Sequence, residues 1–155
     1  MKCCWLNKQN NENLIVFFAG WSFDEIPFQN LSAQNYDILF VYDYNNLAIP
    51  EELKNINYDF DLLVVPDGGS NDKQQIEILN KQNKQVLILD HHLYNETLSN
   101  NAIRINCQDG QYSNTEISGV GVCYKFFHLY EELNNLEHYS DTMLDLVAIG
   151  NIGDM

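Results

Sequence analysis

The chain of 155 residues is poor in several residue types, and each shortage argues against a class of protein. It has only 8 lysines and arginines against 22 aspartates and glutamates, which gives a formal net charge of −14. Proteins that hold duplex nucleic acid by its phosphates usually have the opposite balance, so a long duplex is not the expected partner. A small phosphorylated molecule, or the end of a short single-stranded nucleic acid held through metal ions, remains compatible with this charge.

Cysteine and long hydrophobic runs are also scarce. None of the four cysteines belongs to a C-x-x-C pair, which argues against a zinc knuckle and favours reduced thiols in a cytoplasmic protein. No run of ~18 apolar residues and no signal-peptide pattern occurs, so we expect no membrane span. The length suits a single domain with a sizeable core.

Three apolar stretches each lead directly into an aspartate. They are residues 38–42 before Asp43, residues 62–66 before Asp67, and residues 86–89 before Asp90, His91 and His92. Continuous apolar runs are typical of parallel strands that are buried on both faces. The carboxyl ends of such strands, ~5 Å apart, meet at the edge where open α/β sheets bind ligands. The pattern predicts an α/β fold with a mostly parallel sheet, helices on both faces, and a metal site at that edge.

The rest of the pattern alternates strands and helices. Residues 61–89 read as a β-α-β unit whose helix covers roughly 72–83. Further strands are expected at 14–18 and 103–106. Further helices are expected at 118–134 and after Ser140, which would cap the last helix. A helix is also expected after Asp24, with Pro27 in its first turn, and a short helical turn at 51–55.

The strand-end residues have the chemistry of a metal centre. Carboxylate oxygens with neutral imidazole suit Mn²⁺, Mg²⁺ or Zn²⁺, and the mixture favours manganese. Two metals ~3.5–4 Å apart can hold a phosphoryl group and activate a water, which requires several carboxylates and a histidine. Asp43, Asp67, Asp154 and His91 supply these ligands, and His92 is left to donate to the phosphate or the leaving group.

For two other histidines the sequence gives less reason to expect a functional role. His128 and His138 lie on or near helices without an evident set of acidic partners. Such histidines are more often solvated or packed in a core, so no role is assigned to them.

Four ordered segments carry a resemblance to a known family: residues 65–72 (VPDGGSND), 87–92 (LILDHH), 118–125 (SGVGVCYK) and 144–155 (LDLVAIGNIGDM). Residues about 57–155 thereby resemble the DHH phosphoesterase superfamily, most closely its RecJ-like exonuclease branch. The resemblance implies a Rossmann-like core and a Mn²⁺-dependent phosphodiesterase. It implies that Asp67 bridges two metals and that His91 and Asp154 are ligands.

The same resemblance implies roles for the neighbouring residues. His92 would face the scissile phosphate, Asp90 would orient the imidazoles, and Gly119 and Gly121 would lie at a helix N-terminus that favours phosphate. The family begins with an Asp-x-Asp motif, for which Asp43-Tyr44-Asn45 is the best candidate. With asparagine in the second place, one metal would be held more weakly. The family's C-terminal substrate-binding domain is missing, so we expect a truncated core.

The first fifty residues have a second resemblance. Residues 14–21 (LIVFFAGW) and 41–47 (VYDYNNL) resemble the opening of BioG-type pimeloyl-carrier-protein methyl esterases. These α/β-hydrolases need a nucleophile elbow of the form G-x-S-x-G, which is absent, and neither Ser70 nor Ser118 has the required flanking glycines. A carboxylic ester hydrolase is therefore the weakest hypothesis. A metal-dependent phosphoesterase is the first, and a non-catalytic or truncated metal-binding domain is the alternative.

Overall fold

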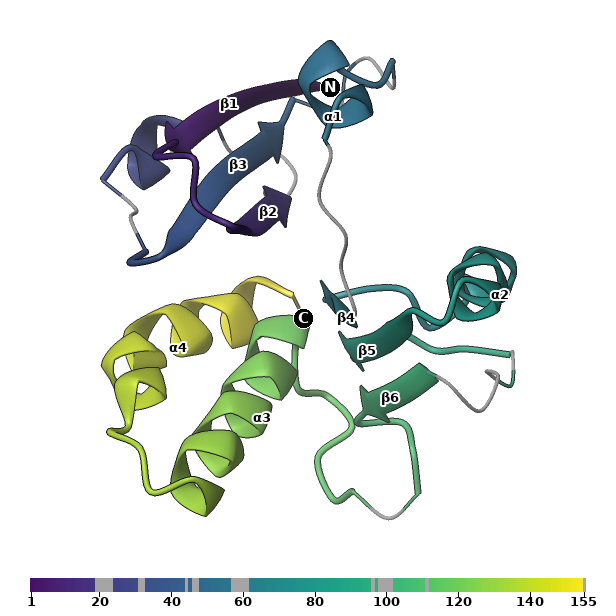
Figure 1. The fold of residues 1–155 in the computed structure, drawn as a ribbon. Helices are drawn as coiled ribbons and strands as arrows, with labels where there is room; N and C mark the ends of the chain where they lie inside the picture. Colours follow the sequence, from purple (N-terminus) through teal and green to yellow (C-terminus); the bar gives the residue numbers. More distant parts are fainter. Residues whose placement is uncertain are drawn as a thin grey trace. The chain divides into compact units, whose positions relative to one another are not determined.

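The structure is a computed structural model that describes residues 1–18, 24–30, 33–43, 45, 48–56, 62–95, 97, 102–110 and 112–154 (Figure 1). The chain divides into two compact units, Met1–Asp59 and Phe60–Met155, and each is described by itself. Both units combine strands with helices, so the predicted α/β class is confirmed. Among the described helices, none has both the length and the apolar character that crossing a membrane requires.

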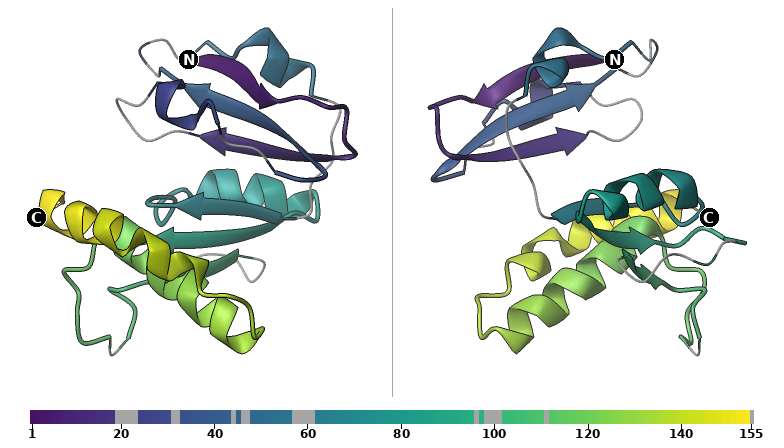
Figure 2. Two further views of the ribbon diagram at one scale, coloured as in Figure 1. Left: turned by 90° about the vertical axis from the view of Figure 1, so that its left-hand side faces the viewer. Right: turned by 45° about the vertical axis from the view of Figure 1, so that its right-hand side comes forward.

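The N-terminal unit is a three-stranded sheet with two short helices. Its elements are β1 (Lys2–Asn7), β2 (Asn13–Phe18), the 3-10 helix η1 (Ile26–Phe28), β3 (Tyr36–Tyr42) and α1 (Glu51–Lys54). The strand order is β1-β3-β2, with β1 antiparallel and β2 parallel to the central β3 (Figure 2). The apolar run of β3 forms the core of this unit: Ile38, Leu39, Phe40 and Val41 are all buried.

The C-terminal unit contains the predicted β-α-β arrangement. Its elements are β4 (Leu62–Pro66), α2 (Lys73–Lys81), β5 (Gln85–Asp90), β6 (Ala102–Asn106), α3 (Gly119–Leu133), the 3-10 helix η2 (Tyr139–Met143) and α4 (Leu144–Gly153). The sheet order is β4-β5-β6, and both pairs of strands are parallel.

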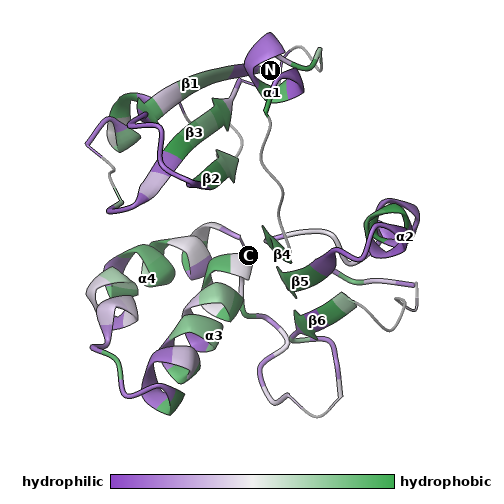
Figure 3. Ribbon diagram, viewed as in Figure 1, coloured by the Kyte–Doolittle hydropathy of each residue, from purple (hydrophilic) through white to green (hydrophobic). Residues whose placement is uncertain are grey.

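Helices cover both faces of the central strand of this sheet, as predicted. Val86 and Ile88 of β5 pack with Ile76 of α2, whereas Leu89 packs with Val122 of α3. Alternate residues of a strand point to opposite faces, which explains why two core clusters form. In Figure 1, α2 and α3 accordingly lie on opposite sides of β5, and Figure 3 shows the hydrophobic side of α2 turned toward the sheet.

Burial on both faces holds for β3 and β5 but not for β4. Leu62 and Val64 of β4 have exposed fractions of 50% and 40%. An edge strand of a three-stranded sheet has neighbours on one side only, and α2 packs mainly against β5. The apolar run therefore correctly predicted a strand at this position, but three of its five residues are exposed because the strand lies at the edge of the sheet.

Two predicted helix starts differ from the structure. Ser140 was expected to cap the last helix, but it lies inside η2 and its hydroxyl donates to Glu131 at 2.5 Å, while α4 begins at Leu144. The helix predicted after Asp24 is only the single turn η1, with Pro27 near its start. In both places the signal marks a helical segment, but the element that forms there is a short 3-10 helix whose N-cap is another residue, Glu25 for η1 and His138 for η2.

Candidate metal centre

The site is built where strands β4 and β5 end. Asp67 follows β4, and its amide donates to the carbonyl of Leu89 in β5 at 2.7 Å. Asp67 has a φ of 57°, a left-handed conformation that aspartate adopts more readily than most residues. This sharp turn ends the strand and leaves the Asp67 carboxylate at the end of the sheet.

The start of helix α3 lies directly against this carboxylate. A Cβ atom on Gly119 would lie 2.0 Å from Asp67 Oδ1, so only glycine allows the helix to approach so closely. Ser118 caps the helix by accepting from the amide of Gly121 at 3.4 Å. Gly119 therefore lies at the site, while Gly121 takes part in the cap, and the role of both in phosphate binding stays a prediction.

Three predicted ligands converge from three different elements. His91 follows β5, and its Nε2 lies 3.3 Å from Asp67 Oδ1. The same nitrogen lies 3.2 Å from Oδ2 of Asp154, the residue that directly follows α4. Asp67 and Asp154 thus approach the same nitrogen of His91 although the chain separates them by many residues. One ligand atom each of Asp67, His91 and His92 lies within 4.8 Å of the other two, which is close enough for one ion.

The surroundings of the Asp67 carboxylate favour binding of a cation. Partial desolvation, together with the nearby charges of Asp154 and Asp90, raises the pKa of Asp67 even though His91 and His92 oppose the shift. A carboxylate whose ionisation is disfavoured by burial, and in smaller part by neighbouring carboxylates, is stabilised by a bound cation. The donor set of carboxylate oxygens and imidazole nitrogen therefore fits a divalent metal.

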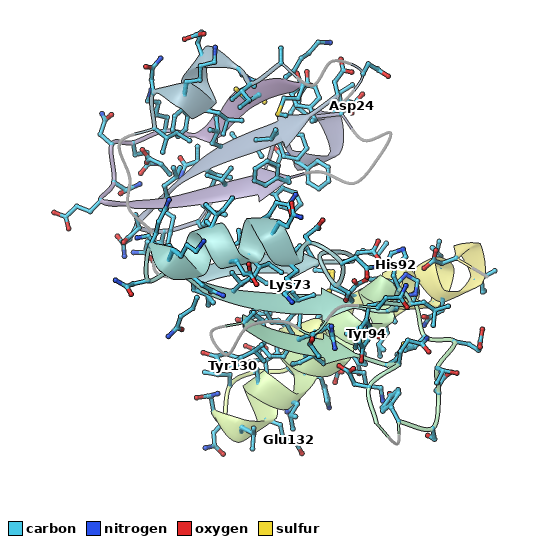
Figure 4. The ribbon with its side chains drawn as sticks, turned by 90° about the vertical axis from the view of Figure 1, so that its right-hand side faces the viewer. Asp24, Lys73, His92, Tyr94, Tyr130 and Glu132 are labelled. Carbon is cyan, nitrogen blue, oxygen red and sulfur yellow. The ribbon has the colours of Figure 1, made fainter. Side chains whose placement is uncertain are left out.

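His92 is held by the buried Asp90. The Asp90 side chain is 1% exposed, and its Oδ1 lies 2.7 Å from His92 Nδ1, while the imidazole of His92 is 57% exposed (Figure 4). Asp90 also accepts from the amides of Ser70, His91 and His92 at 3.1, 2.8 and 3.2 Å.

These hydrogen bonds change the pKa values of both Asp90 and His92. Burial alone raises the pKa of Asp90, but the hydrogen bonds that it accepts outweigh burial and lower the pKa to about 2. The hydrogen bond to Asp90 raises the pKa of His92. Asp90 is therefore a fixed anion that keeps His92 oriented and favours its protonated form.

Sequence reasoning missed two asparagines that organise the site. Asn106 ends β6, and its Nδ2 donates to Ser70 Oγ at 3.2 Å and to the carbonyl of His92 at 3.0 Å. Asn151 of α4 accepts from the amide and the hydroxyl of Ser118 at 3.0 and 2.7 Å. The position of Asn106 at a strand end could have identified it, whereas no local pattern marks Asn151.

Asp43 lies in the N-terminal unit. Its carboxylate lies 2.7 Å from Lys2 Nζ and accepts from Asn45 Nδ2 at 2.7 Å, and the hydrogen bond to Lys2 is the main cause of its lowered pKa. The strand before it, β3, belongs to the sheet of that unit, so the expectation that all three strand-end aspartates share one sheet holds only for Asp67 and Asp90. Its role as a metal ligand stays a prediction.

The parallel sheet with carboxylates and imidazoles at its carboxyl edge defines an α/β protein with a candidate divalent-metal centre. The family is shown by comparison with known proteins: residues 6–151 match the family described as "DHH family, N-terminal domain", and the chain belongs to this family. The match also includes residues 14–47, the stretch with the esterase resemblance. That resemblance stays a prediction, and residues 19–23, 31–32, 44, 46 and 47 of the stretch lie outside the described residues.

Two relatives share 40% identity with this chain over 97 residues. One, from Bacillus subtilis (strain 168), is named "Putative SPbeta prophage-derived single-strand DNA-specific exonuclease YorK". The other, from Bacillus phage SPbeta, is named "Putative single-strand DNA-specific exonuclease yorK". Each match covers 62% of this chain but 16% of the relative, so the chain spans only a small part of the length of these proteins.

Proposed function

We propose that the chain is the metal-holding part of a phosphoesterase that hydrolyses phosphodiesters at the ends of short single-stranded nucleic acids. The approach of the Asp67 and Asp154 carboxylates to the same nitrogen of His91 is the observation that carries this proposal. Membership of the DHH family supports the reaction, and the names of the two relatives support the substrate class. A net charge of −14 favours a short strand over a long duplex.

Asp67, His91 and Asp154 would hold Mn²⁺ or Mg²⁺, and we propose two ions. When bound, the metal would supply a Lewis acid that lowers the pKa of a water and neutralises phosphate charge. The raised pKa of Asp67 is in line with this assignment, because a bound cation would offset the burial and the neighbouring charges that disfavour its ionisation.

His92 would act on the substrate, with Asp90 as its positioning residue. Because Nδ1 of His92 is engaged by Asp90, Nε2 is the nitrogen left to reach a phosphate oxygen or the leaving oxygen. The raised pKa of His92 keeps the imidazole protonated to higher pH, so it can donate a proton from Nε2. The amide of Gly119, at the N-terminus of a 15-residue helix, would add a donor for the phosphate.

A non-catalytic metal-binding domain is the alternative that a specific observation favours. Asn45 stands where the family has a second acid, and it donates to Asp43, which is also paired with Lys2. An amide adds no charge to a metal site, so one metal would be held more weakly and a two-metal reaction would be lost more easily than metal binding itself. Ester hydrolysis gains no such support, because Ser70 and Ser118 are both buried.

The test compares the chain with Asp67→Asn in the presence of Mn²⁺, using bis(p-nitrophenyl) phosphate and an end-labelled short DNA strand. We expect Asp67→Asn to lose at least ~100-fold in rate, since even changes outside the ligand shell cost ~10–100-fold. Asp72→Asn is the matched control, because Asp72 lies in the same loop, is exposed and makes no side-chain capping bond.

The outcomes separate the two functions. Equal rates for the chain and for Asp67→Asn would contradict the proposal. Mn²⁺ binding by the parent chain without hydrolysis of either substrate would instead support the non-catalytic alternative.

A further inference from the structure

A second cluster of metal-ligating side chains lies where α3 meets η2. His128 and Glu131 are three residues apart on α3 and so share one face of the helix, and His138 immediately precedes η2. One ligand atom from each of the three residues lies within 4.8 Å of the other two. The expectation that His128 and His138 have no acidic partners is therefore wrong, because folding brings them next to Glu131 and Asp141.

The two imidazoles approach each other through the same ring nitrogen. The Nδ1 atoms of His128 and His138 are 3.4 Å apart, and the ring centroids are 4.8 Å apart. This separation exceeds the ~2.7–3.2 Å that is usual for hydrogen bonds from N–H donors. Two nitrogens bound at ~2.0–2.1 Å to one tetrahedral Zn²⁺ lie roughly 3.3–3.4 Å apart. The spacing is therefore long for a hydrogen bond and matches the separation of two ligands on one ion.

The carboxylate of Glu131 is held as a metal ligand should be. Glu131 is buried, and its two oxygens accept from the amide of Ser140 at 3.1 and 3.3 Å. The hydroxyl of Ser140 donates to Oε2 at 2.5 Å. Such outer hydrogen bonds orient a ligating carboxylate, and a nearby cation offsets the cost of burying its charge.

Further negative charge adjoins the cluster. Oδ1 of Asp141 lies 3.2 Å from His128 Nδ1 and accepts from the hydroxyl of Tyr124 at 2.9 Å. The cluster thus combines two imidazoles with two carboxylates, a donor set that suits zinc better than magnesium or calcium.

We propose that His128, Glu131 and His138 bind one Zn²⁺ ion, with water completing the coordination, at a site separate from the DHH centre. The ion cross-links α3 to η2 across the connection formed by residues 134–138. Because η2 leads directly into α4, the site stabilises the packing of α4 against α3.

The test measures zinc binding in a chain whose DHH centre has lost two of its proposed metal ligands through Asp67→Asn and His91→Gln. After removal of metal with a chelator, Zn²⁺ is titrated by calorimetry into this chain and into the same chain carrying His138→Gln or His128→Gln. We expect each histidine variant to bind one equivalent fewer, or to bind it at least ~100-fold more weakly. Because thiols also bind zinc, only this difference between variants counts.

Glu132→Gln is the matched control. Glu132 neighbours Glu131, is exposed and projects from the C-terminal part of α3 (Figure 4), so its loss removes the same charge without removing a ligand. This variant should bind zinc like its parent.

A second measurement keeps the test decisive if one variant folds poorly. Long-range ¹H–¹⁵N spectra of the imidazoles should show the Nδ1 signals of both histidines shifting on addition of Zn²⁺. Unchanged Nδ1 signals, or equal zinc binding by the parent and both histidine variants, would overturn the proposal. The phosphoesterase proposal is unaffected by either outcome, because the DHH centre is absent from every chain compared.

Discussion

Replacing Asp90 with asparagine tests the buried network behind the histidine pair. The carboxylate accepts from the amides of Ser70, His91 and His92 and pairs with the ring of His92, at distances of 2.7–3.2 Å. Asparagine keeps the shape but replaces one acceptor oxygen with an NH₂ group, which then faces donors. The substitution therefore removes a charge and leaves at least one buried donor without its partner.

The pKa of Asp90 determines how much stability the carboxylate contributes and how that contribution changes with pH. Burial raises this pKa, but the accepted hydrogen bonds lower it from the usual 3.8 to about 2. A carboxyl whose pKa is lowered in the folded state stabilises the fold above its unfolded pKa, and this stability is lost as the pH falls through the folded pKa. The lowered pKa corresponds to about 2 kcal/mol of stability, most of which is lost between about pH 4 and pH 2. An unpaired buried donor costs a further ~1–3 kcal/mol at every pH.

The assay is urea unfolding of the chain and of Asp90→Asn, followed by circular dichroism from pH 7 to pH 2 with a chelator present. At pH 7 the free energy of unfolding of the variant should be lower than that of the parent by at least about 2 kcal/mol. This difference between parent and variant should decrease by about 2 kcal/mol as the pH falls to 2. The exposed Asp72→Asn change should stay within ~0.5 kcal/mol of the parent throughout.

Two results would refute this reasoning. Equal stability of the parent and Asp90→Asn at pH 7 would mean that the hydrogen bonds to Asp90 do not stabilise the fold. A gap that stays constant from pH 7 to pH 2 would mean that the pKa of Asp90 is not lowered.

Three further predictions concern the same site. Gly119→Ala places a methyl group 2.0 Å from a carboxylate oxygen and should weaken Mn²⁺ binding ~10-fold or more in a calorimetric titration, whereas Gly68→Ala, with no atom within 4 Å, should not. Because Asp90 raises the pKa of His92, the hydrolysis rate should fall as the pH rises through that raised pKa, and Asp90→Asn should move the fall to lower pH in a pH–rate profile. Asn106→Ala removes three hydrogen bonds, to Ser70, His92 and Gln108, and should lower the free energy of unfolding by about 1–3 kcal/mol, as urea unfolding would measure.

Most strands of the fold could be predicted from hydrophobic patterning. The apolar runs before Asp43, Asp67 and Asp90 are strands β3, β4 and β5, and the helices expected near residues 72–83 and 118–134 are α2 and α3. Patterning reports which residues avoid water, but it does not report which strands pair. The division of these strands between two sheets therefore could not be read from it.

The candidate site could be predicted in part for the same reason. Asp67 and His91 follow neighbouring parallel strands, so strand geometry alone brings them to one edge of the sheet. Asp154 reaches His91 only because α4 packs on α3, through the bond from Ser118 to Asn151 and the close contact of Gly150 with Val120. Helix packing depends on side chains distant in sequence, so composition and spacing could not show it.

What the sequence by itself determined is the α/β class, the strand ends, and the acids and histidines available to a metal, because these depend on local periodicity and on residue chemistry. What only the tertiary structure decided is which of these groups meet. His128 and His138, which looked unpartnered along the chain, lie beside Glu131 because the chain turns back between α3 and η2. Ligand groups act within a few ångströms, and distances on that scale between remote residues follow from packing and not from spacing along the chain.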